Sequence, residues 1–199
     1  MTIVVGGCHA CSQFIFYNAK PRNMLEQIIF SAIAGFFAKT TDEGAENPPP
    51  FPSFVFILAA LAYGIILGCL AVSSPLSSLF LALAISAILA AKIDHPFHIL
   101  GLCAFAGMII FFQIAAFDPW LFSLFLAASL FDELALPLGR LLGRLSNERL
   151  YTPLAALAVL LAGGEWIFFA AIVSFDIAYR MAKFAMGKAT KGAKKARRR

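Results

Sequence analysis

The chain has 199 residues, of which 61% are hydrophobic and only 14% are charged. An ordinary soluble domain is about 45–50% apolar and about 25% charged, so a soluble protein of this size could not bury so much apolar surface. The net charge of +5 is uneven, because nine of the sixteen Lys and Arg residues lie at or after Arg180. The composition predicts a single-domain integral membrane protein.

Residues 1–23 form a short N-terminal segment before the apolar pattern begins. The stretch "CHAC" at 8–11 is a CxxC with a histidine inside it. A lone CxxC lacks the second cysteine pair of a zinc site and the strand–helix context of a redox motif, so neither role is assigned. Met24 directly precedes the membrane pattern and is an alternative start of the protein.

Apolar segments then follow one another along the chain, at about 24–38, 53–72, 76–91, 97–117, 119–137 and 151–179. Backbone groups in lipid must form hydrogen bonds within their own element, so all of these segments are predicted to be helices. The fold class is therefore an all-α, polytopic transmembrane helical bundle spanning 24–180. The segment 40–53, with three consecutive prolines, is predicted to be a loop.

The last apolar segment is too long for one membrane span, because about 20 residues cross the hydrocarbon core. Its middle reads "LAGGEW", and one straight helix would put Glu165 near the centre of the membrane. A charged residue there costs about 2.5–3.5 kcal/mol on insertion scales. We therefore favour a hairpin, with a turn at Gly163, Gly164 and Glu165 and seven spans in total, over a single helix and six spans.

The positive-inside rule orients this arrangement. With seven spans, fourteen of the sixteen basic residues fall on one face, the nine from Arg180 onward included. We expect a multi-pass protein of the cell (plasma) membrane with a disordered, basic cytoplasmic tail at 181–199. Anionic lipid headgroups are the expected partner of this tail. Nucleic acid is not an expected partner, because no aromatic residue follows Phe184.

Polar residues recur where the first, third, fifth and seventh predicted spans end. If the spans alternate in direction, these endings share the cytoplasmic side and form one polar cluster. Recurring Ala-Lys and Phe-Asp pairs at the endings also suggest a repeat of helical hairpins. The predicted functional cluster is Lys39, Asp42, Glu43, Lys92, Asp94, His95, His98, Asp132, Glu133 and Asp176.

Some of these residues also have a purely structural interpretation. Asp94 and His95 are suited to cap a helix that begins at Pro96. Asp132 and Asp176 lie among apolar residues, where an ionisable group is expensive and usually faces the bundle interior. For these two we favour function or a buried pair with an arginine.

The cluster contains oxygen and nitrogen donors that a divalent cation could use, namely Asp94, His95, His98, Asp132 and Asp176. They match no compact metal motif, and the metal is not identified. Arg140 and Arg144, one helical turn apart in "LGRLLGRL", are either part of an amphipathic interfacial helix or a site for a lipid phosphate or another anion.

Three functions fit the sequence. We favour binding or transport of a cation, a proton or a small solute, because ionisable residues within a membrane are typically functional. The first alternative is an enzyme that acts on a lipid phosphate or headgroup, for which no catalytic motif is present. The second is a non-catalytic membrane subunit. Whether the protein is an enzyme, and whether it forms an oligomer, is left open.

Overall fold

A computed structural model describes residues 23–46, 51–72, 75–91, 95–114, 116–134 and 149–196. These ranges contain seven helices and no strand, so the predicted all-α fold is confirmed. In chain order the helices are α2 (Met24–Glu46), α3 (Ser53–Ala71), α4 (Ser77–Leu89), α5 (Pro96–Phe112), α6 (Pro119–Glu133), α8 (Tyr151–Leu161) and α9 (Ile167–Ala196).

Of the described helices, only α3 is long and apolar enough, at 19 residues, to cross a membrane by these two criteria. Helices α4, α5 and α8 are apolar but have 13, 17 and 11 residues. At 1.5 Å per residue they are shorter than a hydrocarbon core of about 30 Å. Multiple membrane crossings therefore stay a prediction.

The hairpin at the paired glycines is present. Helix α8 ends at Leu161, α9 begins at Ile167, and Gly163 between them has a φ of +85°. This left-handed backbone conformation is one that glycine adopts without steric cost. The exposed Glu165 lies in the connection, as the hairpin hypothesis requires.

Two predicted irregular segments are helical instead. Helix α2 continues to Glu46, where the sequence predicted a loop from residue 40. The Thr40 and Thr41 hydroxyls donate hydrogen bonds to backbone carbonyls one turn earlier, so their polar side chains are satisfied within the helix. Helix α9 continues to Ala196, because the basic segment is rich in Ala and Lys and contains no proline. The prediction of a disordered tail was wrong for 181–196.

Two helices begin at a proline that follows a capping residue. His95 precedes Pro96 of α5, and its Nδ1 accepts a hydrogen bond of 3.3 Å from the Phe97 amide. Asp118 precedes Pro119 of α6, and its Oδ1 accepts hydrogen bonds from the amides of Trp120 and Leu121. The predicted capping role is thus confirmed for His95.

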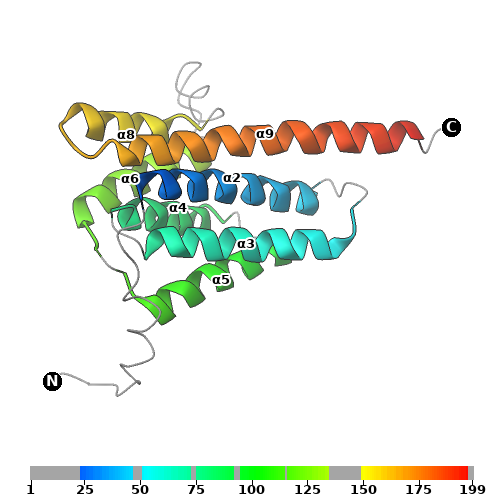
Figure 1. Cartoon of the computed structure of the whole chain (residues 1–199), viewed down its shortest axis with the longest axis horizontal. Coiled ribbons are helices and arrows are strands. Elements are labelled where there is room, and N and C mark those ends of the chain that lie inside the picture. Colours follow the sequence, from blue (N-terminus) through cyan, green and yellow to red (C-terminus); the bar gives the residue numbers. More distant parts are fainter. Residues whose placement is uncertain are drawn as a thin grey trace.

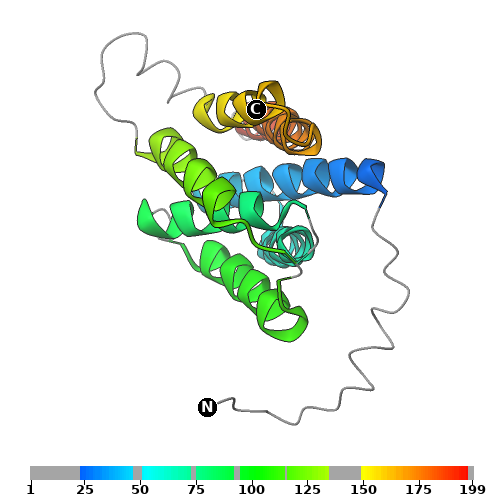
Figure 2. The same ribbon diagram turned by 90° about the vertical axis from the view of Figure 1, so that its left-hand side faces the viewer.

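The contacts between six of the described helices close into a ring, in which α2, α3, α4, α6, α8 and α9 each pack against the next and α9 packs against α2. Successive helices run in alternating directions, so the ends of α2, α4 and α6 lie toward the same end of the bundle as the beginnings of α3, α5 and α8 (Figure 1). Helix α5 packs mainly against α3 (Figure 2). Because α4 and α5 do not pair in the same way, the packing gives the predicted hairpin repeat no direct support.

Small side chains bring the helices close together. Ser31 on α2 donates a 2.7 Å hydrogen bond to the Ala171 carbonyl on α9, and Gly35 lies directly against the Phe175 backbone. Gly64 on α3 lies in the same way against the Gly101 carbonyl on α5. Such close backbone contacts are typical of helix packing in membranes.

Candidate functional site

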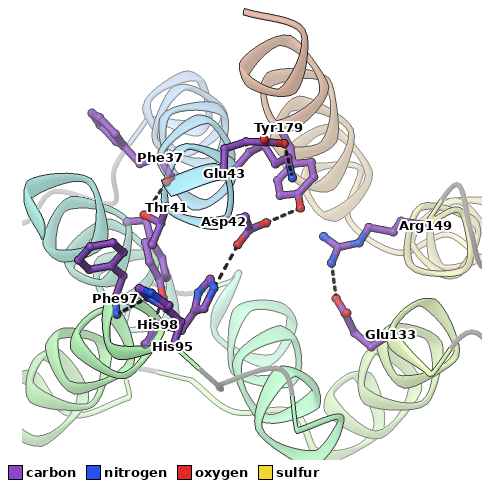
Figure 3. A network of polar contacts seen from close by, with 12 residues as sticks. Phe37, Thr41, Asp42, Glu43, His95, Phe97, His98, Glu133, Arg149 and Tyr179 are labelled. Atoms are coloured by element: carbon purple, nitrogen blue, oxygen red, sulfur yellow. Dashed lines mark hydrogen bonds and ion pairs between the residues drawn. The ribbon is translucent and has the colours of Figure 1, made fainter. Parts of the chain in front are cut away.

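A cavity of about 620 Å³ lies inside the ring, toward the end where α2, α4 and α6 finish. Apolar side chains contribute to its wall, among them Leu67, Leu83, Leu102, Phe105 and Phe175. The wall also has a set of polar residues, called its polar side here, which are Asp42, Tyr63, His95, His98, Glu133, Arg149 and Tyr179. Figure 3 shows these polar side chains from α2, α5, α6 and α9 converging with Arg149.

Asp42 is at the centre of the polar side. Its Oδ2 accepts a 2.5 Å hydrogen bond from the Tyr179 hydroxyl, and its Oδ1 lies 3.7 Å from His98 Nε2. Asp42 lies beyond the apolar part of α2, on the helical extension that the sequence predicted to be a loop. Burial raises the pKa of Asp42, and the Tyr179 hydrogen bond and the charge of Lys39 only partly offset this effect.

The Tyr179 ring interacts with two cations. Lys39 Nζ lies 5.4 Å from the ring centroid and the Arg149 guanidinium carbon lies 5.0 Å from it. Lys39 is only 6% exposed and forms an ion pair of 2.9 Å with Glu43, one turn along α2. These contacts hold the Tyr179 hydroxyl against Asp42.

Arg149 lies just before α8 and has a left-handed backbone, with a φ of 53°. Its guanidinium donates a 2.8 Å hydrogen bond to Glu133 Oε1, and its side chain is 35% exposed. Burial alone would lower the pKa of Arg149, but Tyr179 and the carboxylates of Glu133 and Asp42 together raise it above its ordinary value. Arg149 therefore stays charged at the cavity wall.

Asp132 has a structural role at the beginning of α8. Its two oxygens accept hydrogen bonds from the Tyr151 amide (2.9 Å), the Thr152 amide (2.8 Å) and the Thr152 hydroxyl (2.7 Å). Leu150, the residue at the cap position of α8, offers no side-chain hydrogen bond. Asp132, on α6, thus supplies the cap that α8 lacks.

Asp176 lies apart from the main cavity. It lines a smaller cavity of about 30 Å³, together with Asp132, Glu133 and Arg149. Arg149 and Glu133 line both cavities and connect the two groups of acids.

The two histidines belong to the polar side of the main cavity. Because His95 Nδ1 accepts a backbone hydrogen bond, its neutral ring carries the proton on Nε2. His98 faces Asp42, and the Tyr63 hydroxyl donates a long, 3.4 Å hydrogen bond to the His98 carbonyl. The neutral His95 ring can therefore donate a hydrogen bond within the cavity.

Most of the predicted cluster thus lies close together. The network of contacts at the main cavity contains Lys39, Asp42, Glu43, His95, His98 and Glu133. The neighbouring small cavity is lined by Asp132 and Asp176. Several predicted residues lie outside the described ranges, namely Lys92 and Asp94 of the cluster, the anion-binding pair Arg140 and Arg144, and the CxxC at 8–11.

The predicted cluster omitted Tyr179, Arg149 and Tyr63, which line the cavity. Tyr179 and Arg149 had a sequence signal, since both stand at polar ends of apolar segments. Tyr63 is a lone polar residue in the middle of α3, and only the crossing of α3 and α5 brings it to the site.

The predicted metal site finds no support in the described part of the chain. No group of three or more His, Cys, Asp or Glu side chains there is close enough to hold one ion. His95 and Asp132 each accept hydrogen bonds at a helix start, which occupies donor atoms that a metal would need. Asp94, which completes the predicted ligand set, is not among the described residues.

Comparison of the chain with known protein families, with curated proteins and with solved structures gave no significant match. The cavity and its residues are therefore the features that indicate a function.

Proposed function

We propose that this chain is a multi-pass membrane protein that binds a small solute in the cavity inside its helical ring and binds or releases a proton at Asp42. The single observation that carries the proposal is the 620 Å³ cavity, whose wall combines partly buried carboxylates with apolar side chains. Such a combination is typical of binding sites for small molecules.

The outer surface of the bundle supports membrane insertion. Every described helix carries at least one exposed large apolar side chain, for example Phe54 on α3, Phe111 on α5 and Leu161 on α8. Lipid tails solvate such side chains as well as a protein interior does. In the plasma membrane, the distribution of basic residues favours an orientation with the cavity mouth and the basic end of α9 on the cytoplasmic side.

An organic solute fits this site better than a metal ion. The volume is far larger than a single ion needs, and the described residues provide no compact set of metal ligands. Ionisable groups next to open space are also suited to exchange a proton when a solute enters or leaves.

The first alternative, chemistry on a lipid phosphate, depends on Arg140 and Arg144, which lie outside the described ranges. No observation on the cavity favours it over solute binding.

A thermal-shift screen of the purified full chain tests the proposal. The compounds are small cationic, anionic and neutral amphiphiles, and the key variant is Ala84→Phe, which fills the cavity from α4. The matched control is Ala127→Phe, at an exposed position of α6. We expect at least one class to raise the melting temperature of the wild type and the control but not of Ala84→Phe. The proposal is wrong if no class distinguishes these variants.

A further inference from the structure

The charges at the cavity wall do not cancel. Glu133 is paired with Arg149 at 2.8 Å, and Lys39, behind Tyr179, is paired with Glu43 at 2.9 Å. No described Lys or Arg forms an ion pair with Asp42. With Asp42 ionised and the histidines neutral, the wall has one net negative charge; with Asp42 protonated, it has none.

One oxygen of Asp42 is available to a ligand. Oδ2 accepts from the Tyr179 hydroxyl, whereas Oδ1 is 3.7 Å from His98 Nε2, beyond normal hydrogen-bond distance (Figure 3). Asp42 lines the cavity, so an entering cation can approach this oxygen without displacing a Lys or an Arg.

The rest of the wall suits an apolar body. Phe105 and Phe175 contribute aromatic rings, and Leu67, Leu83 and Leu102 contribute aliphatic side chains. Aromatic faces attract cations, and the attraction is stronger where water is excluded. The cavity therefore combines a carboxylate that no Lys or Arg pairs with directly and a wide apolar surface.

We infer that the cavity binds a lipophilic organic cation, and that this cation and a proton compete for the Asp42 carboxylate. The inference rests on the proposed function and specifies its solute. When the cation enters, the proton leaves Asp42 for water, so one positive charge replaces another. The groups that face Asp42 and modulate this exchange are Lys39 on its own helix, Tyr63 on α3, His98 on α5, Arg149 before α8 and Tyr179 on α9.

Two ions of matched shape and opposite charge test the inference, namely tetraphenylphosphonium and tetraphenylborate. Their binding to the purified full chain in detergent is measured between about pH 5 and about pH 8. Only binding that the cavity-filled Ala84→Phe protein lacks is counted, which removes partitioning into micelles. The other variants are Asp42→Asn and Glu165→Gln, the latter removing an exposed carboxylate from the α8–α9 connection.

We expect the wild type and Glu165→Gln to bind the phosphonium at least about tenfold more tightly than the borate at the higher pH. The phosphonium affinity should fall as the pH is lowered, because the proton occupies Asp42. In Asp42→Asn we expect about a tenfold loss of affinity and a weaker dependence on pH, to which only the cavity histidines still contribute.

A further variant, Tyr179→Phe, tests the role of Asp42 while keeping its carboxylate. The result therefore does not depend on whether Asp42→Asn folds. Tyr179→Phe removes the hydrogen bond that favours the ionised carboxylate, so the pH of half-maximal phosphonium binding should shift upward. A merely structural role of Tyr179 would change affinity without moving this midpoint.

Each contrary outcome overturns a defined part of the inference. Equal or tighter binding of the borate would exclude a cation preference but leave solute binding intact. Wild-type affinity in Asp42→Asn, or an unmoved midpoint in Tyr179→Phe, would exclude proton exchange at Asp42. If neither ion binds, the inference fails, and the broader screen with Ala84→Phe still decides the proposed function.

Discussion

Single carboxylates in this protein have distinct roles that depend on their surroundings. Asp42 faces the cavity, with a neutral hydroxyl on one oxygen, whereas Asp132 is only 8% exposed and accepts three hydrogen bonds from the beginning of α8. The first arrangement leaves room for a ligand and the second does not. Asp132 is therefore part of the structure that positions Arg149, two residues before Tyr151.

Replacing Asp132 with alanine should destabilise the protein. The change leaves two backbone amides and the Thr152 hydroxyl without their acceptor, which costs about 2 kcal/mol. We expect a lower melting temperature in detergent, monitored by circular dichroism. Glu165→Ala, which removes an exposed carboxylate, should melt like the wild type. Equal melting of the two variants would contradict the capping role.

Asp42 should make stability depend on pH. Because burial raises its pKa above 3.8, folding favours the protonated carboxyl. This contribution is present in full below pH 3.8 and is lost as the pH rises through the folded-state pKa. The melting temperature of the wild type should therefore fall, relative to that of Asp42→Asn, across this interval. If the melting temperatures of the two proteins changed in parallel with pH, folding would not raise the pKa of the Asp42 carboxyl.

At the scale of helices, the sequence predicted what depends on local chemistry. The glycines at 163 and 164 and the charge of Glu165 placed the turn between α8 and α9, and the capping role of His95 followed from Pro96. The extension of α2 was not predicted, because the polar composition of "TTDEGAE" is typical of a loop. On the helix, its two threonine hydroxyls bond to backbone carbonyls one turn earlier, and Glu43 pairs with Lys39. That extension carries Asp42.

The contact between α3 and α5 should depend on one glycine. A Cβ atom at Gly64 would overlap the Gly101 carbonyl oxygen, whereas a Cβ atom at Gly107 would meet no atom within 4 Å. We expect Gly64→Ala to cost about 1–3 kcal/mol, because two backbones must separate. Gly107→Ala should leave stability unchanged or raise it by up to about 1 kcal/mol. Thermal unfolding of both variants measures the difference, and equal effects would argue against this close packing.

At the scale of the molecule, the sequence predicted that polar helix ends would share one side, and the alternating helices bring most of them together. It could not predict the ring, because the pairing of α2 with α9 joins segments about 140 residues apart and depends on small side chains such as Ser31. The cavity, and the membership of Tyr63 and Tyr179 in its wall, follow from that ring.

The proposed orientation predicts that the two ends of the bundle face opposite sides of the membrane. Ser53, at the beginning of α3, lies toward the cavity end, and Glu165 lies at the other end; both are exposed. In a cysteine-free background, an impermeant maleimide added to intact cells should label Glu165→Cys, because that end is outside. It should label Ser53→Cys only after permeabilisation, since the basic residues hold the cavity end in the cytoplasm. Labelling of both positions in intact cells would contradict the proposed arrangement, and the reverse pattern would invert the orientation while keeping the membrane crossings.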